Sequence, residues 1–118
     1  MLRLILVSSL LLIMFSCSST SKNNLNTGSS KSDIALYKEG MRYLKLKDFE
    51  NAIEIFTELE IVHPYSSLSS KSQLMAGFAQ YMSNEYEEAI LTLTKFIELN
   101  PDHESIPYAM YLKAFSYY

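Results

Sequence analysis

The chain has 118 residues, a length that predicts one folded domain. Its formal net charge of −3 lacks the basic excess of a nucleic-acid-binding protein, so we expect no nucleic-acid partner. The single cysteine excludes an internal disulfide framework and an intramolecular zinc site built on several thiolates.

The N-terminus has the pattern of a secretory signal. Residues 4–15 form a mostly apolar run after Arg3, too short to span a membrane and typical of a signal peptide. Ser16 and Cys17 follow directly, and a small residue before a cysteine at this place resembles the lipobox of bacterial lipoproteins. The resemblance implies a signal peptide over residues 1–16 and lipid attachment at Cys17. The alternative is a signal cut elsewhere, which would leave Cys17 an ordinary thiol.

Residues 17–32 are rich in serine, threonine and asparagine, and Leu25 is their one large apolar residue. This composition cannot bury enough apolar surface to order itself. We therefore expect a lipid-anchored flexible tether with a reach on the order of 20 Å. In lipoproteins of this kind an aspartate after the cysteine favours the inner membrane, so Ser18 points to the outer membrane.

The remaining chain repeats itself at an offset of 37 residues. Glycine in a helix costs about 1 kcal/mol relative to alanine, so both repeated glycines predict the close approach of a second helix. The repeated prolines mark the places where a helix must end. The repeat-packing positions are Gly40 and Gly77, Ala52 and Ala89, Pro64 and Pro101, with Ala114 at the small position of a third copy.

This pattern resembles the tetratricopeptide repeat (TPR), a helical hairpin that stacks into a solenoid. The resemblance implies an all-α TPR domain over residues 33–118, with two repeats and the first helix of a third. Because the third repeat stops after one helix, we expect a truncated chain. Repeat 1 is predicted at about 33–65, repeat 2 at about 66–102 and the start of repeat 3 at about 103–118. Helices are expected over about 33–46, 49–62, 70–82, 86–99 and from about 105 onward.

Local signals refine the first hairpin. Asp33 is the preferred N-cap of its first helix, with Ser32 as the alternative. Helical spacing places one stripe of like charges on each of the first two predicted helices, and we favour the interpretation that both stripes face solvent. A basic partner for the acidic stripe is the alternative. The stripes are Lys38, Arg42 and Lys45 on the first helix and Glu50, Glu54 and Glu58 on the second.

The sequence carries no pattern of catalytic or metal-binding residues. His63 and His103 occupy equivalent turns without further ligands, so turn residues are favoured over a metal site. Neither a glycine-rich phosphate loop nor a G-x-S-x-G motif occurs. We therefore predict a protein that is not an enzyme and uses no cofactor.

The inner faces of the first helices of the TPR hairpins predict a shallow peptide groove. Its apolar and aromatic side chains, with phenol hydroxyls at the edge, suit an extended or turn peptide that carries an aromatic residue. The equally weighted alternative is that this stripe is core. The candidate groove residues are Tyr37, Met41, Leu44, Leu74, Phe78, Tyr81, Tyr108, Tyr111, Phe115 and Tyr118.

The repeat junctions resemble the BamD family, lipoproteins of the outer-membrane β-barrel assembly machinery. The stretches 96–103 (FIELNPDH) and 106–112 (IPYAMYL) resemble the family's junction between repeats 2 and 3, and 64–66 (PYS) resembles its first junction. The chain departs from the family at His63 and Leu68, where the family usually has an aromatic residue, and at Ala114, where it usually has glycine. The resemblance covers the whole chain but only the first half of the family's five-repeat fold.

This resemblance implies a scaffold that is lipid-anchored on the periplasmic side of the outer membrane. Its implied partners are BamA, the other subunits of the machinery, and unfolded outer-membrane proteins, which the N-terminal repeats would recognise. One alternative is another periplasmic TPR lipoprotein, in pilus assembly or cell division. The less favoured alternative is a TPR appendix of a cell-wall enzyme.

Overall fold

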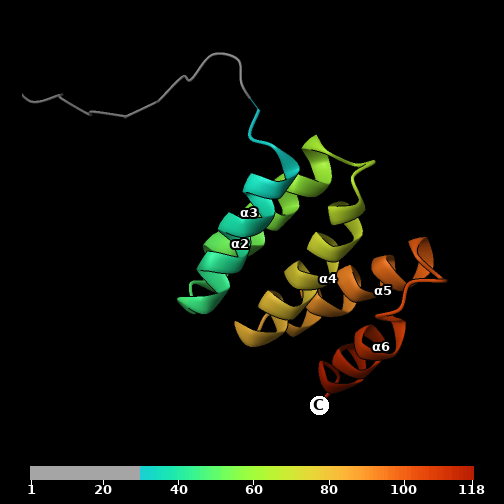
Figure 1. Cartoon of the computed structure of the whole chain (residues 1–118). Helices are drawn as coiled ribbons and strands as arrows, with labels where there is room; N and C mark the ends of the chain where they lie inside the picture. Colours follow the sequence, from blue (N-terminus) through green and yellow to red (C-terminus); the bar gives the residue numbers. More distant parts are fainter. Residues whose placement is uncertain (1–29) are drawn as a thin grey trace, which may run out of the picture.

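The computed structural model describes residues 30–118 as five α-helices arranged in a row (Figure 1). Each helix packs against the next, and alternate helices also touch, α2 with α4 and α4 with α6. This arrangement confirms the predicted all-α hairpin solenoid within the described range. The predicted signal peptide, Cys17 and most of the tether lie outside the described residues. The helices are α2 (Asp33–Lys45), α3 (Phe49–Val62), α4 (Ser67–Met82), α5 (Tyr86–Leu99) and α6 (Ile106–Phe115).

The turns inside the two hairpins have the same backbone geometry. Lys47 and Asn84 occupy equivalent positions and both adopt left-handed conformations, with φ of 59° and 66°. The amide of Lys47 donates to the carbonyl of Leu44 at 3.0 Å, and the amide of Asn84 donates to that of Tyr81 at 3.2 Å. The 37-residue period of the sequence is therefore also present in the backbone conformation of the turns.

Both repeated glycines lie where a second helix comes close, as predicted. A Cβ atom at Gly40 would lie 2.6 Å from Cε1 of Phe56. At Gly77 it would lie 2.8 Å from Cδ2 of Leu93. Both distances are shorter than ordinary contacts, and both facing side chains are fully buried. In each hairpin, one large side chain thus covers a glycine on the neighbouring helix.

The prolines follow the second helix of each hairpin, also as predicted. Helix α3 ends at Val62 and α5 at Leu99, two residues before Pro64 and Pro101 respectively. The residue before each proline has left helical geometry, with φ and ψ of −126° and 57° in the first repeat and −130° and 56° in the second. Proline disfavours helical geometry in its predecessor, so the two helices end for the same reason.

The core consists of two clusters of buried residues that share Met75 at their margin. Ala52 and Ala89 are fully buried, one in each cluster, as their small size predicted. Ala114 is instead exposed, because no described helix covers its side of α6. The cluster of α3 and α4 contains Ala52, Phe56, Ala76 and Ala79. The cluster of α4, α5 and α6 contains Leu74, Ala89, Leu93, Phe96, Ala109 and Leu112.

The prediction of Asp33 as the first N-cap is wrong, because Ser32 takes this role. The Ser32 hydroxyl accepts the backbone N–H of Ala35 at 3.2 Å. Asp33 is the first helical residue, and its carboxylate accepts the Ser66 hydroxyl at 2.5 Å. This hydrogen bond is the main cause that lowers the pKa of Asp33, and a hydrogen bond from the Ile34 amide is the second. Asp33 therefore ties the start of α2 to the start of α4.

Helix α4 begins earlier than the expected residue 70. Ser66 caps it by accepting the Leu68 amide at 3.0 Å, and the helix starts at Ser67. Serine serves both turns and helix starts, which is why the sequence alone placed this segment in a turn. Ser69 and Ser72 are buried on α4, so helix packing decides its extent.

Candidate functional site

The candidate groove residues on α2 are half-buried and contribute to the core of repeat 1. Tyr37, Met41 and Leu44 pack against the cluster of α3 and α4. The Tyr37 ring lies 5.8 Å from the Phe56 ring, centroid to centroid, with a tilt of 58°. Such tilted contacts are favourable for aromatic pairs. These three side chains therefore stabilise the hairpin and offer only their edges to a ligand.

The candidate residues on α4 divide between core and surface. Leu74 is only 4% exposed and belongs to the cluster of α4, α5 and α6. Phe78 and Tyr81 are half-buried against that cluster. The Tyr81 ring also lies 5.8 Å from that of Tyr86. Leu74 thus has almost no surface for a peptide, whereas Phe78 and Tyr81 keep part of theirs.

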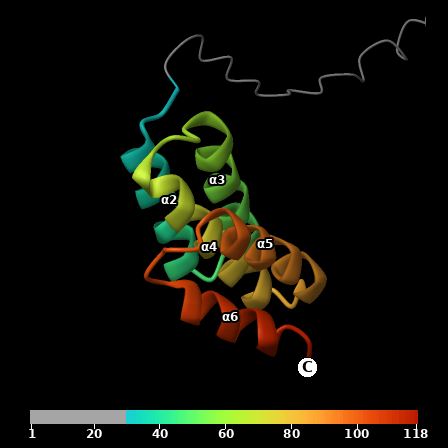
Figure 2. The same cartoon turned by 90° about the vertical axis from the view of Figure 1, so that its right-hand side faces the viewer.

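The candidate residues on α6 and just after its end are exposed, and we call them the α6 aromatic surface: Tyr108, Tyr111, Phe115 and Tyr118. Helix α6 lies at the end of the row opposite α2 (Figure 2). The ring centroids of Tyr111 and Phe115 lie 4.5 Å apart with a tilt of 40°, although these side chains are 56% and 49% exposed. Burial, and then the nearby Tyr111, raise the pKa of the Tyr108 phenol.

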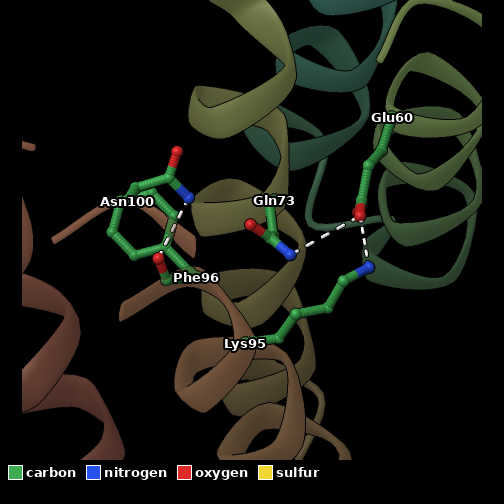
Figure 3. Close-up of polar contacts among 5 residues, drawn as sticks. All are labelled: Glu60, Gln73, Lys95, Phe96 and Asn100. Atoms are coloured by element: carbon green, nitrogen blue, oxygen red, sulfur yellow. Dashed lines mark hydrogen bonds and ion pairs between the residues drawn. The ribbon is translucent and has the colours of Figure 1, made fainter. Parts of the chain in front are cut away.

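A polar link between the repeats was not predicted. The Glu60 carboxylate of α3 forms an ion pair with Lys95 of α5 and accepts the side-chain amide of Gln73 of α4 at 3.5 Å (Figure 3). Beside it, the Asn100 amide donates to the Phe96 carbonyl at 3.0 Å and closes α5. Glu60 and Lys95 are far apart in the sequence, so no local pattern could have identified the pair.

Metal-holding groups and helices able to span a membrane are both absent from residues 30–118. This part of the chain contains no group of three or more His, Cys, Asp or Glu side chains that could hold a metal ion. None of its helices is both long enough and apolar enough to cross a membrane. The exposed apolar side chains of this part include Tyr108, Tyr111 and Phe115 of α6, although Tyr65, Ile61 and Leu91 on other segments are more exposed.

The sequence of this helical domain matches a known family. YfiO, described as an outer membrane lipoprotein family, matches residues 29–118. The chain belongs to the YfiO family. Named relatives include the outer membrane protein assembly factor BamD of Caulobacter vibrioides, 45% identical over 83 residues, and that of Rickettsia prowazekii, 39% identical over 83 residues.

Both of these alignments with YfiO-family relatives cover 70% of this chain, but only 27% and 33% of the two relatives. BamD of Neisseria meningitidis serogroup B is 31% identical over 78 residues, which cover 66% of this chain and 29% of the relative. The chain therefore spans about a third or less of the length of these relatives.

Membership of the YfiO family confirms the predicted resemblance to the BamD family. It favours this interpretation over another periplasmic TPR lipoprotein and over a TPR appendix of a cell-wall enzyme. The family description indicates an outer-membrane location. The named relatives are assembly factors, which agrees with the prediction of a non-enzymatic scaffold.

Proposed function

We propose that this protein is a TPR scaffold that takes part in assembling and inserting β-barrel proteins into the outer membrane. The observation that carries the proposal is the family match over residues 29–118, whose relatives are named outer membrane protein assembly factors. The row of helical hairpins agrees with this role, because stacked hairpins present extended surfaces to partners. The proposed partners are BamA, the other subunits of the assembly machinery, and unfolded outer-membrane proteins.

We further propose that a lipid on Cys17 anchors the protein on the periplasmic side of the outer membrane. The cysteine directly follows the signal-like run and Ser16, and the family is described as a lipoprotein family. Cells that express the chain with labelled palmitate should incorporate the label into it. Cys17→Ser should abolish labelling and leave the signal uncut, whereas the neighbouring Ser19→Ala should be processed and labelled normally. Equal labelling of Cys17→Ser would refute the anchor.

The proposed substrate contact is the α6 aromatic surface, which would recognise peptides that carry an aromatic residue. The supporting observation is the close, tilted pair of exposed rings formed by Tyr111 and Phe115. Exposed aromatic pairs of this kind provide contact area at a low cost in side-chain entropy. The phenol of Tyr108 can donate a hydrogen bond to a peptide carbonyl. Phe78 and Tyr81 would supply the adjoining edge.

Binding of a fluorescent peptide that ends in phenylalanine tests this contact. Tyr111→Ala should lower the affinity about tenfold, the effect of losing one aromatic anchor at an interface. The matched control is Tyr65→Ala, because Tyr65 is fully exposed but lies in the turn between α3 and α4. It should leave the affinity unchanged. A peptide that ends in alanine should bind less well than the phenylalanine peptide, and equal binding of the two would contradict the proposal.

A further inference from the structure

We infer that a basic stripe on α2, formed by Lys38, Arg42 and Lys45, docks the folded domain on an anionic lipid surface. The inference rests on the proposed lipid anchor, because the anchor brings this surface close to lipid. It concerns a different part of the molecule from the α6 aromatic surface, at the opposite end of the row of helices (Figures 1 and 2).

The stripe faces away from the rest of the hairpin. Gly40 marks the side of α2 that contacts α3, and Lys38 and Arg42 lie two residues to either side of it, on the opposite face. All three cations of the stripe are exposed. Two apolar side chains flank them, Ile34 in the first turn and Leu46 at the C-cap, 56% and 65% exposed. Basic side chains beside exposed apolar ones suit contact with an anionic membrane surface.

The positive charges of the stripe are not neutralised by the described part of the chain. The acidic residues of α2 are occupied elsewhere, Asp33 by the Ser66 hydroxyl and Glu39 by Lys31 at 2.7 Å. The ion pairs among residues 30–118 are this one and that of Glu60 with Lys95, so none involves the stripe. The Arg42 guanidinium lies 4.2 Å from the centroid of the Tyr43 ring, a contact that keeps its charge.

The position of the stripe favours lipid over other anionic partners. Helix α2 is the first helix after the predicted tether, so an anchored chain would meet headgroups at a high effective concentration. The acidic stripe of α3 does not oppose this docking. Glu54 and Glu58 lie two residues to either side of Phe56, which faces α2, and therefore point away from α2. The basic stripe and these two carboxylates thus lie on different faces of the hairpin, although Glu58 acts on Lys31, whose pKa is raised first by Glu39 and more weakly by Glu58.

Co-sedimentation with vesicles tests the inference on the chain without its signal peptide and with Cys17 unmodified. At low ionic strength it should bind vesicles of equal parts phosphatidylglycerol and phosphatidylcholine, but not pure phosphatidylcholine. Each basic residue near an anionic surface contributes about fivefold in partitioning, so Lys38→Gln with Lys45→Gln should lower binding roughly 25-fold.

The matched control is Lys71→Gln with Lys113→Gln, which removes the same charge from α4 and α6 and should change binding less than about twofold. Circular dichroism should show equal helix content in all variants. An equal loss in both double variants would overturn the inference, because net charge alone would then explain binding. Absence of binding to either vesicle would also overturn it and reassign the stripe to an acidic protein. The palmitate experiment on Cys17 is independent, so failure of the anchor and failure of the stripe are distinguishable.

Discussion

Replacing Phe56 by alanine should lower the free energy of unfolding by about 3–5 kcal/mol, the cost of removing a buried aromatic ring from a packed core. Phe56 is fully buried, covers Gly40 and contacts the Tyr37 ring. Its loss therefore removes the contact that joins α2 to α3 and leaves a cavity in the cluster shared with α4. Urea unfolding followed by circular dichroism measures the effect.

The control for this experiment is Tyr65→Ala, because Tyr65 is an aromatic residue with its whole side chain in solvent. Its removal should change stability by less than about 0.5 kcal/mol. A loss of less than about 1 kcal/mol for Phe56→Ala would show that repeat 1 does not depend on this core contact.

Gly40→Ala should destabilise the protein by about 1–3 kcal/mol, although alanine is the better helix former. The new Cβ atom would lie within 2.8 Å of three atoms of the Phe56 ring, which is buried and rigid. Gly77→Ala should stay within about 1 kcal/mol of wild type, because the facing Leu93 can rotate and helix propensity offsets the crowding. Gly77→Leu should cost at least about 1 kcal/mol.

A double variant separates crowding from other effects of the alanine. Repeat 2 places a leucine where repeat 1 has Phe56, so Phe56→Leu should make room for the Cβ atom of Gly40→Ala. Measured by the same urea unfolding, the double variant should lose less stability than the sum of the two single variants. Additive losses would mean that the glycine is needed for a reason other than the ring above it.

The 37-residue repeat made most of the fold predictable, because its glycine, alanine and proline positions determine helix contacts and helix ends through local steric effects. The bounds of α3 and α5 agree with the prediction, and their ends are fixed by proline. The start of α4 was not predictable, since the hydroxyls of a serine-rich segment serve turns and caps equally well. The role of Asp33 depends on Ser66, which only the folded chain brings close.

The candidate groove was less predictable than the fold. Helical spacing identified one stripe on each first helix, but it does not tell how deeply the neighbouring repeat covers that stripe. Leu74 is core, Tyr37 is shared between core and surface, and Tyr111 is exposed, although all three occupy the same position in the period. Their difference arises from which helices lie beside each, a property of the tertiary arrangement.

The shared geometry of the Lys47 and Asn84 turns has a consequence for how such a molecule can grow. A duplicated hairpin inserted at these turns would meet both neighbours with the same backbone orientation. The side chains then decide which hairpin can be copied. Where α2 has Arg42, α4 has the fully buried Ala79, 37 positions later. A copy of repeat 2 would therefore fit inside a longer array. A copy of repeat 1 would bury the Arg42 guanidinium without a partner, so we expect the array to lengthen by copies of repeat 2 and not of repeat 1.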